Sequence, residues 1–191
     1  MALSSINIEK VGNTLIYLRQ SLSFLSKTKA LKLLYLIEEQ AVAKFGHQIL
    51  NLDFEVWKHG PVDRQLYYEL SNSELNLLKP YIQIENFQSG KSIQAKAAFN
   101  DDEFSTSDLK LIDEVIKNFG HLNANELIEI THREGSPWHN QARKHNKFFW
   151  LFNNTTDELI DLSQVISTDN NKKQHFKEHQ EFINLALDLN K

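Results

Sequence analysis

The sequence predicts a mainly α (α+β) protein, in which a helical domain is built around a central buried helix and carries a small antiparallel β-sheet. Three observations predict this fold class. Apolar residues recur three and four positions apart over several long segments, as they do in amphipathic helices. One of these segments is apolar on almost every side, which is typical of a buried helix. A few short segments alternate between apolar and polar residues, as half-buried strands do.

The first two helices are predicted over residues 6–25 and Thr28–Phe45. In the first, the apolar positions are Leu15, Leu18, Leu22 and Leu25. The second ends before Gly46, a residue type that favours the left-handed conformation at helix ends. Between Ala30 and Ile37 almost every side of this second helix is apolar, so we expect it to cross the centre of the domain.

A strand is predicted over Leu52–Trp57, where apolar and polar residues alternate. Pro61 suits the first position of a helix, since its missing N–H has no partner there in any case. We therefore expect the strand to pass into a helix at Gly60-Pro61. Two further strands, Tyr81–Glu85 and Ser92–Ala97, flank a turn and are expected to join the first strand in one small sheet.

The later helices have clear start signals. Ser105 with Asp108, and Asn123 with Glu126, form capping boxes at the starts of two helices. The first of these helices is expected to end at Gly120. The second is expected to end by residue 135, after which Ser136-Pro137 begins another short helix.

Residues 1–147 are predicted to form the helical domain with its small sheet, and residues 148–191 a helical C-terminal extension. In the extension, Thr155 and Glu158 suggest a further capping box. A terminal helix is predicted over Lys172–Asn190, and its apolar face is formed by Phe176, Ile183 and Leu187.

Composition and charge exclude several classes of function. Of the 191 residues, 41% are hydrophobic and 24% are charged, as in folded globular proteins. The formal net charge of −4 argues against nucleic acid as a partner. The chain has no Cys, which excludes disulfides, thiolate catalysis and Cys-ligated zinc. Its first residues do not resemble a signal peptide, and no apolar run reaches the roughly 18 residues of a membrane span. We expect a cytoplasmic protein with no membrane segment.

The candidate partner-binding residues are four aromatic and histidine side chains around the Gly60-Pro61 step. Trp57 and His59 lie beside a rigid turn, where they are either anchors for a partner or parts of the corner itself. Tyr67 and Tyr68 fall on adjacent helix faces, so at least one hydroxyl is expected to point to solvent or to another chain.

His132 and Trp138 complete the candidate set. Thr131 and His132 are expected to close a helix end, where histidine can bond the last carbonyls, and Trp138 is expected to pack against the core. The histidines in "THREGSPWHNQARKH" are not spaced for one helix face, so no metal is predicted there. "HFKEH", residues 175–179, matches a zinc-protease pattern but is interpreted as a solvated helix face. The lysines at positions 27, 29 and 32 form either a small basic patch for an acidic partner surface or the RNA-like groove of a toxin, or a solvated face, which is the usual role of such a charge run. We expect no catalytic residues, no metal and no cofactor.

Three stretches, taken in order, resemble the Panacea domain family. They are "KTKALKLLYLIEEQAVAKFG", "FEVWKHGPVDRQLYYEL" and "FGHLNANELIEITHREGSPWHNQARK", and the resemblance extends from about Gly12 to Lys147. One departure is Glu38-Glu39, where the first motif of the family has aromatic or small residues. The resemblance implies a mainly helical, non-enzymatic antitoxin that neutralises a cognate protein toxin by direct binding.

The toxin is expected to be encoded by the adjacent gene, in a toxin-antitoxin or prophage locus. The alternative is a phage-related regulatory protein, either a proteolytic adaptor or a transcriptional repressor. Salt-dependent binding to its own promoter is the mark of a repressor. Self-association into a homo-oligomer stays open.

Overall fold

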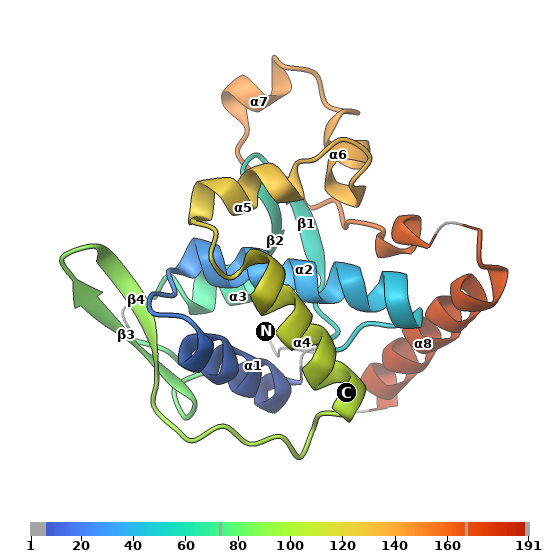
Figure 1. Cartoon of the computed structure of the whole chain (residues 1–191). Coiled ribbons are helices and arrows are strands. Elements are labelled where there is room, and N and C mark those ends of the chain that lie inside the picture. Colours follow the sequence, from blue (N-terminus) through green and yellow to red (C-terminus); the bar gives the residue numbers. More distant parts are fainter. Residues whose placement is uncertain (1–6, 73, 167, 190–191) are drawn as a thin grey trace.

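Helix α2, Lys27–Phe45, crosses the middle of the molecule and contacts helices and strands on several sides (Figure 1). The computed structural model describes residues 7–72, 74–166 and 168–189. It is mainly helical with two small antiparallel sheets, which confirms the predicted fold class. In chain order the other elements are α1 (Ile8–Ser21), β1 (Phe54–Trp57), β2 (Gly60–Asp63), α3 (Arg64–Glu69), β3 (Ile82–Phe87), β4 (Gly90–Ala95), α4 (Thr106–Phe119), α5 (Ala124–Thr131), α6 (Pro137–Ala142), α7 (Phe149–Phe152), the 3-10 helix η1 (Leu162–Val165) and α8 (Asn170–Leu189).

The burial of α2 confirms the prediction of a central helix. Every residue from Ala30 to Glu39 is buried. The helix begins after Ser26, whose hydroxyl accepts a hydrogen bond from the N–H of Lys29 at 3.3 Å. It ends at Gly46, which has a φ of 76° and donates its N–H to the carbonyl of Val42.

Helix α1 is shorter than predicted. It ends at Ser21 instead of residue 25, and the predicted start at Ile6 lies outside the described residues. Leu22 and Leu25 are nevertheless buried, because Leu25 packs at β4 and Leu22 lies against Gly120 at the end of α4. In this connection the N–H of Leu25 bonds to the hydroxyl of Ser92 at 3.2 Å.

The predicted passage from strand to helix at Gly60-Pro61 is wrong. Gly60 has a φ of 99°, and this left-handed conformation turns the chain back on itself. Residues 60–63 therefore form β2, which pairs antiparallel with β1 and places Pro61 opposite Val56. Proline is accommodated in such a short two-stranded sheet because it lacks only the N–H donor. Helix α3 begins three residues later, where Asp63 accepts the N–H of Leu66 at 2.9 Å.

The prediction of one small sheet is also wrong, because the two hairpins stay separate. Strands β3 and β4 pair only with each other, as do β1 and β2. To join one sheet, the hairpins would have to pair along their outer strand edges, but the edges of β4 and β1 already form backbone hydrogen bonds with other segments. The N–H of Ile93 in β4 donates to the carbonyl of Leu25 at 2.8 Å. The free edge of β1 is covered by residues 154–160.

The start signals of the later helices are confirmed. Ser105 with Asp108 and Asn123 with Glu126 form reciprocal capping boxes at α4 and α5. Ser136 caps α6, in which Pro137 is the first residue. These local signals therefore fix where three of the helices begin.

Residues 154–160 run along β1 in an extended conformation. The N–H of Val56 donates to the carbonyl of Glu158 at 3.0 Å, and the N–H of Ile160 donates to the carbonyl of Phe54 at 2.7 Å. The predicted capping box of Thr155 and Glu158 is wrong, since Glu158 donates its N–H to the hydroxyl of Thr156 and no helix begins there. The domain boundary at residue 147 stays a prediction, although Ile160, Leu162 and Ile166 belong to the buried core.

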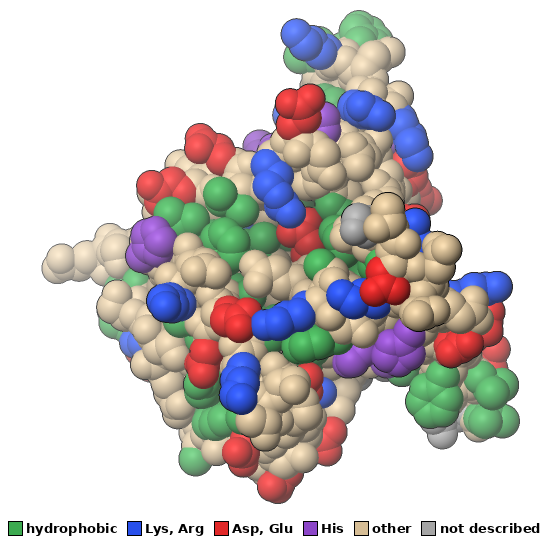
Figure 2. Space-filling view, turned by 45° about the vertical axis from the view of Figure 1, so that its right-hand side comes forward, with side chains coloured by type: hydrophobic (Ala, Val, Ile, Leu, Met, Phe, Trp, Pro, Cys, Tyr) green, Lys and Arg blue, Asp and Glu red, His purple; other side chains and the backbone are tan. Residues whose placement is uncertain are grey.

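Helix α8 lies on the opposite side of the view from the β3–β4 hairpin (Figure 1). Of its predicted apolar face, Phe176 packs against the core and Ile183 is half-buried, while the side chain of Leu187 and residue 190 lie outside the described part. Histidine side chains gather beside this helix (Figure 2). The ring of His47 lies 5.4 Å from that of His175 and 5.6 Å from that of His179. The "HFKEH" segment is thus partly engaged with the end of α2 and is not fully solvated.

Across the described ranges, every helix is too short or too polar to cross a bilayer.

Candidate functional site

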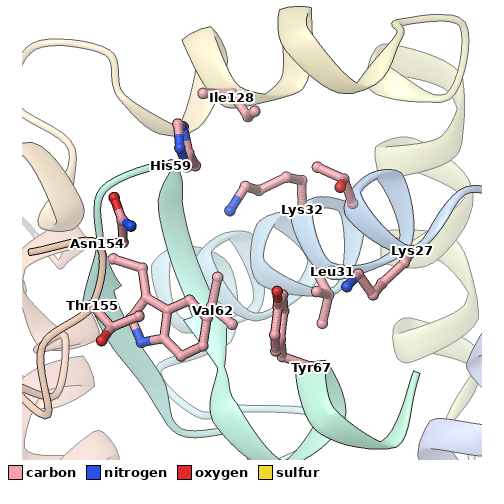
Figure 3. A pocket seen from close by; sticks show the side chains of 11 residues that line it. Lys27, Leu31, Lys32, His59, Val62, Tyr67, Ile128, Asn154 and Thr155 are labelled. Atoms are coloured by element: carbon pink, nitrogen blue, oxygen red, sulfur yellow. The ribbon is translucent and has the colours of Figure 1, made fainter. Parts of the chain in front are cut away.

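A pocket of about 430 Å³ opens at the start of α2, between that helix, the β1–β2 hairpin, α3 and α5 (Figure 3). Its apolar walls are formed by Leu31, Trp57, Val62, Tyr67 and Ile128. Its polar lining consists of Lys27, Thr28, Lys32, His59, Asn154 and Thr155. Among these described lining residues the charges are all positive, and none is acidic.

Lys32 is the buried cation of the pocket. Its relative exposure is 2%, and its Nζ donates to the carbonyl of Pro61 at 2.8 Å. Burial lowers the pKa of Lys32 to about 7. In the described ranges Lys32 forms no ion pair with a carboxylate. Figure 3 shows its side chain extending from α2 toward His59.

Gly60 allows the β1–β2 turn to approach Lys32 closely. A Cβ atom at this position would lie 2.9 Å from Lys32 Nζ, 2.9 Å from the hydroxyl oxygen of Thr131 and 3.1 Å from Nε2 of His132. A glycine is therefore needed for two reasons, the positive φ of the turn and the lack of space for a side chain. As a result, polar groups from α2, α5 and the turn meet at one point.

His132 stands behind Gly60 and is not bonded as the sequence suggested. Its ring stacks on Trp138 with the centroids 3.5 Å apart. Its Nε2 is buried and has no hydrogen-bond partner among the described residues. Burial, and next the positive charge of Lys32, lower the pKa of His132 to about 4. The end of α5 is closed by Thr131, as expected, since its hydroxyl donates to the carbonyl of Ile128 at 2.9 Å. His132 contributes its backbone N–H, which donates to the same carbonyl at 2.9 Å, and not its ring.

Trp57 and Trp138 are fixed by their indole N–H groups. Trp57 donates to the carboxylate of Glu55 at 2.8 Å, and the same oxygen accepts from Arg64 at 2.9 Å. Trp138 donates to the carbonyl of Trp57 at 2.9 Å, so α6 is tied to the end of β1. Trp138 is buried in the core, as predicted.

The two tyrosines of α3 have different surroundings. Tyr67 packs edge-on against Trp57 with the centroids 4.8 Å apart, and the Nζ of Lys27 lies 4.0 Å above its ring. The side chain of Tyr68 is 57% exposed and lies outside the pocket lining. His59 is exposed at the tip of the β1–β2 turn.

The structure thus brings Trp57, His59 and Tyr67 together in the pocket lining, with His132 and Trp138 directly behind them. Tyr68 remains on the adjacent surface. Sequence reasoning named Lys32 only as part of a surface basic patch or a solvated face, and it missed that the side chain is buried. The signal was present, because Lys32 lies inside the segment that is apolar on almost every side.

No cluster of three or more His, Cys, Asp or Glu residues that is suited to hold a metal ion occurs in the part of the chain that the structure describes. The pocket lining presents ammonium, imidazole, hydroxyl and carboxamide groups beside its aromatic and aliphatic walls.

Comparison with known proteins identifies the family. The model of the family described as "Antitoxin SocA-like, Panacea domain" matches residues 31–139, a range that includes most of the pocket lining. The chain is 27% identical over 136 residues to Antitoxin SocA of Caulobacter vibrioides (strain NA1000 / CB15N), covering 70% of this chain and 69% of that relative. No solved structure matches the chain. Because the family model matches more than half of its length, the chain belongs to the SocA-like antitoxin family of Panacea domains.

Proposed function

We propose that this protein is an antitoxin that neutralises a cognate protein toxin by binding it directly. Membership of the SocA-like antitoxin family is the observation that carries the proposal. The toxin is expected to be the product of the adjacent gene. Neutralisation then consists of covering the active surface of the toxin and requires no turnover by this chain.

The contact surface in this proposal is the pocket with its rim, formed by Trp57, His59, Tyr67 and Tyr68. Large aromatic side chains with a polar group are the residues that most often dominate binding energy at protein interfaces. Tyr68 is already exposed, and Trp57 and Tyr67 are held rigidly, so little side-chain entropy is lost when a partner binds. His132 and Trp138 support this surface from behind.

Co-expression tests the proposal. The adjacent reading frame is induced in a bacterial host with and without this protein, and growth and co-purification are followed. We expect growth arrest by the reading frame alone, and rescue together with a stable complex when both are present. A reading frame that is harmless alone, or equally toxic with this protein, would contradict the proposal.

Tyr68→Ala tests the contact surface. Removal of this exposed ring is expected to weaken the complex by about 1 to 2 kcal/mol without lowering stability. Phe87→Ala, which removes an exposed ring in the distant β3–β4 hairpin, is the matched control and should leave binding unchanged.

A further inference from the structure

The pocket contains a positive charge that the fold itself does not neutralise. Lys32 is almost completely buried, and its recorded hydrogen bond goes to a neutral carbonyl, that of Pro61. A buried ammonium group normally has a carboxylate partner, because the loss of water is otherwise uncompensated. The place for such a partner is the open space of the pocket, which Lys32 lines.

A second lysine and a histidine face the same space. Lys27 lies over the ring of Tyr67, and His59 lies across the pocket from Lys32 (Figure 3). The first turn of α2, at Lys27 and Thr28, also lines the pocket, and a helix of this length has a partial positive charge at its N-terminus. The two carboxylates of the hairpin strands are engaged elsewhere. Glu55 accepts hydrogen bonds from Trp57 and Arg64, and Asp63 accepts from the backbone N–H groups of Asp53 and Leu66.

The lining favours a carboxylate over a phosphate. A phosphate group carries nearly two charges and is held by arginine forks, by several backbone N–H groups or by lysines acting as point charges. No arginine is among the described residues that line this pocket. Among the described lining residues Lys32 is the buried ammonium, whereas Lys27 donates to the hydroxyl of Ser71 at 2.9 Å and lies over the ring of Tyr67. A single buried ammonium matches the single charge of a carboxylate. The apolar walls of Leu31, Val62 and Ile128 provide room for aliphatic or aromatic groups next to it.

We propose that this pocket binds an aspartate or glutamate side chain of the toxin, with its carboxylate on Lys32 and an adjoining apolar residue against the walls. This proposal rests on the proposed antitoxin function. The acidic side chain supplies the missing partner of a buried cation. A protein without a carboxylate at that point leaves Lys32 buried and unpaired, so the pocket selects between partners as well as binding them.

The first experiment needs no toxin. NMR follows the side-chain resonances of ¹³C-labelled lysines while sodium phenylacetate is added, and phenylacetamide and inorganic phosphate serve as comparison probes. We expect phenylacetate to shift the Lys32 signal saturably, with a Kd on the order of millimolar for so small a ligand. Phenylacetamide and inorganic phosphate should not shift the Lys32 signal. No saturable shift with phenylacetate, or an equal shift with phosphate, would overturn the proposal.

The second experiment uses the full chain with the toxin. Lys32→Met keeps the length of the side chain and removes its charge. Lys44→Met is the matched control at the other end of α2, where Lys44 pairs with Glu114 on the surface. We expect Lys32→Met to weaken the complex at least about 30-fold, and Lys44→Met to bind like the wild type. Thermal unfolding checks that both variants are folded before their binding is compared.

The outcomes separate the two proposals. If the wild type fails to rescue growth, the antitoxin function fails, while the phenylacetate titration still decides whether the pocket takes a carboxylate. If Lys32→Met binds as tightly as the wild type, the carboxylate pocket is rejected and the antitoxin function stands.

Discussion

Helix α2 carries three buried charged side chains. Glu39 pairs with Arg133, whereas the other two, Glu38 and Lys32, form no ion pair within the described ranges and have completely different surroundings. Glu38 accepts hydrogen bonds from the backbone N–H groups of Ile49, Leu50 and Leu52 and from the side chain of Gln48. Lys32 donates to a single carbonyl and faces a pocket. The carboxylate is thus saturated by the chain itself, whereas the ammonium is not.

The difference shows how a buried charge can indicate its role. Burial raises the pKa of Glu38 to about 7, and the four donors oppose that rise. Burial lowers the pKa of Lys32 to about 7, and no neighbouring carboxylate opposes it. A buried charged group whose hydrogen-bond capacity is met by the chain, such as Glu38, organises the fold, in this case the loop after α2. A buried charged group with unused hydrogen-bond capacity, such as Lys32, is the better candidate for binding a partner.

The two ends of α2 also differ in what covers them. Near Glu38 the loop is closed by α8, where Gln180 donates to Gln48 at 2.5 Å and Lys172 donates to the carbonyl of Ala43 at 3.1 Å. Near Lys32 the surface remains open. The following substitutions test this contrast, from the largest expected effect to the smallest.

Glu38→Ala should have the largest effect. It leaves three buried backbone N–H groups without an acceptor, and we expect the free energy of unfolding to fall by about 3 kcal/mol. Urea denaturation measures this change. Glu114→Ala, at an exposed ion pair, is the control and should change stability by about 0.5 kcal/mol or less. Equal effects of the two substitutions would show that Glu38 does not organise the loop.

Gly60→Ala is expected to cost about 2 kcal/mol of stability, because the residue has a positive φ and its Cβ would crowd Lys32 and Thr131. Gly90→Ala is a matched control, since Gly90 has a φ of 112° but open space around its Cβ position. The difference between the two variants in urea denaturation isolates the crowding at the pocket. If Gly90→Ala is as destabilising as Gly60→Ala, the close approach to Lys32 has no energetic consequence.

Lys32→Met should raise the free energy of unfolding at pH 7 by about 1 kcal/mol, because a buried unpaired charge is replaced by an apolar group. The folded-state pKa of Lys32, about 7, lies below the ordinary value of 10.5. Between these values the unfolded chain binds more protons, so the wild type gains stability as pH rises and the advantage of Lys32→Met narrows. Denaturation at several pH values checks this trend. If Lys32→Met is as destabilised as Glu38→Ala, Lys32 organises the fold as Glu38 does, and the contrast between the two buried charges is wrong.

The contact of α8 with the end of α2 should weaken at low pH, and this is the smallest effect. Burial, and next the charge of a neighbouring histidine, hold the pKa values of His47 and His179 below 6.5. Protonation therefore favours the undocked helix as pH falls below that value. Hydrogen exchange in α8, corrected for intrinsic rates, measures the change, and His179→Gln should reduce it. Protection that is independent of pH would contradict the prediction.

Sequence reasoning found the elements whose causes are local. The capping boxes at Ser105 and Asn123 and the Ser136-Pro137 start depend on residues within one turn of the helix, and all were predicted correctly. The Gly60-Pro61 step was misread because Pro61 fits both a helix start and a short strand. The choice was made by the left-handed conformation of Gly60 and by the contacts of the hairpin with α2 and α5.

The pocket itself was only partly predictable. Trp57, His59 and Tyr67 are close in sequence and were recognised as a group. The meeting of Lys32 and His132 around Gly60 joins segments far apart in the chain, and no local pattern reveals it. The burial of Lys32 was nevertheless readable, since a lysine in the middle of an all-apolar helix has no solvated face to occupy.

The extended segment over residues 154–160 has a consequence for how the chain is made. It occupies the hydrogen-bonding edge of β1, and unpaired strand edges are templates for pairing with other chains. During synthesis the hairpin of β1 and β2 is complete long before residue 160 leaves the ribosome. In nascent chains the edge of β1 is therefore unpaired for a time and can pair with other chains. A chain truncated before residue 154 would keep this unpaired edge and its tendency to aggregate.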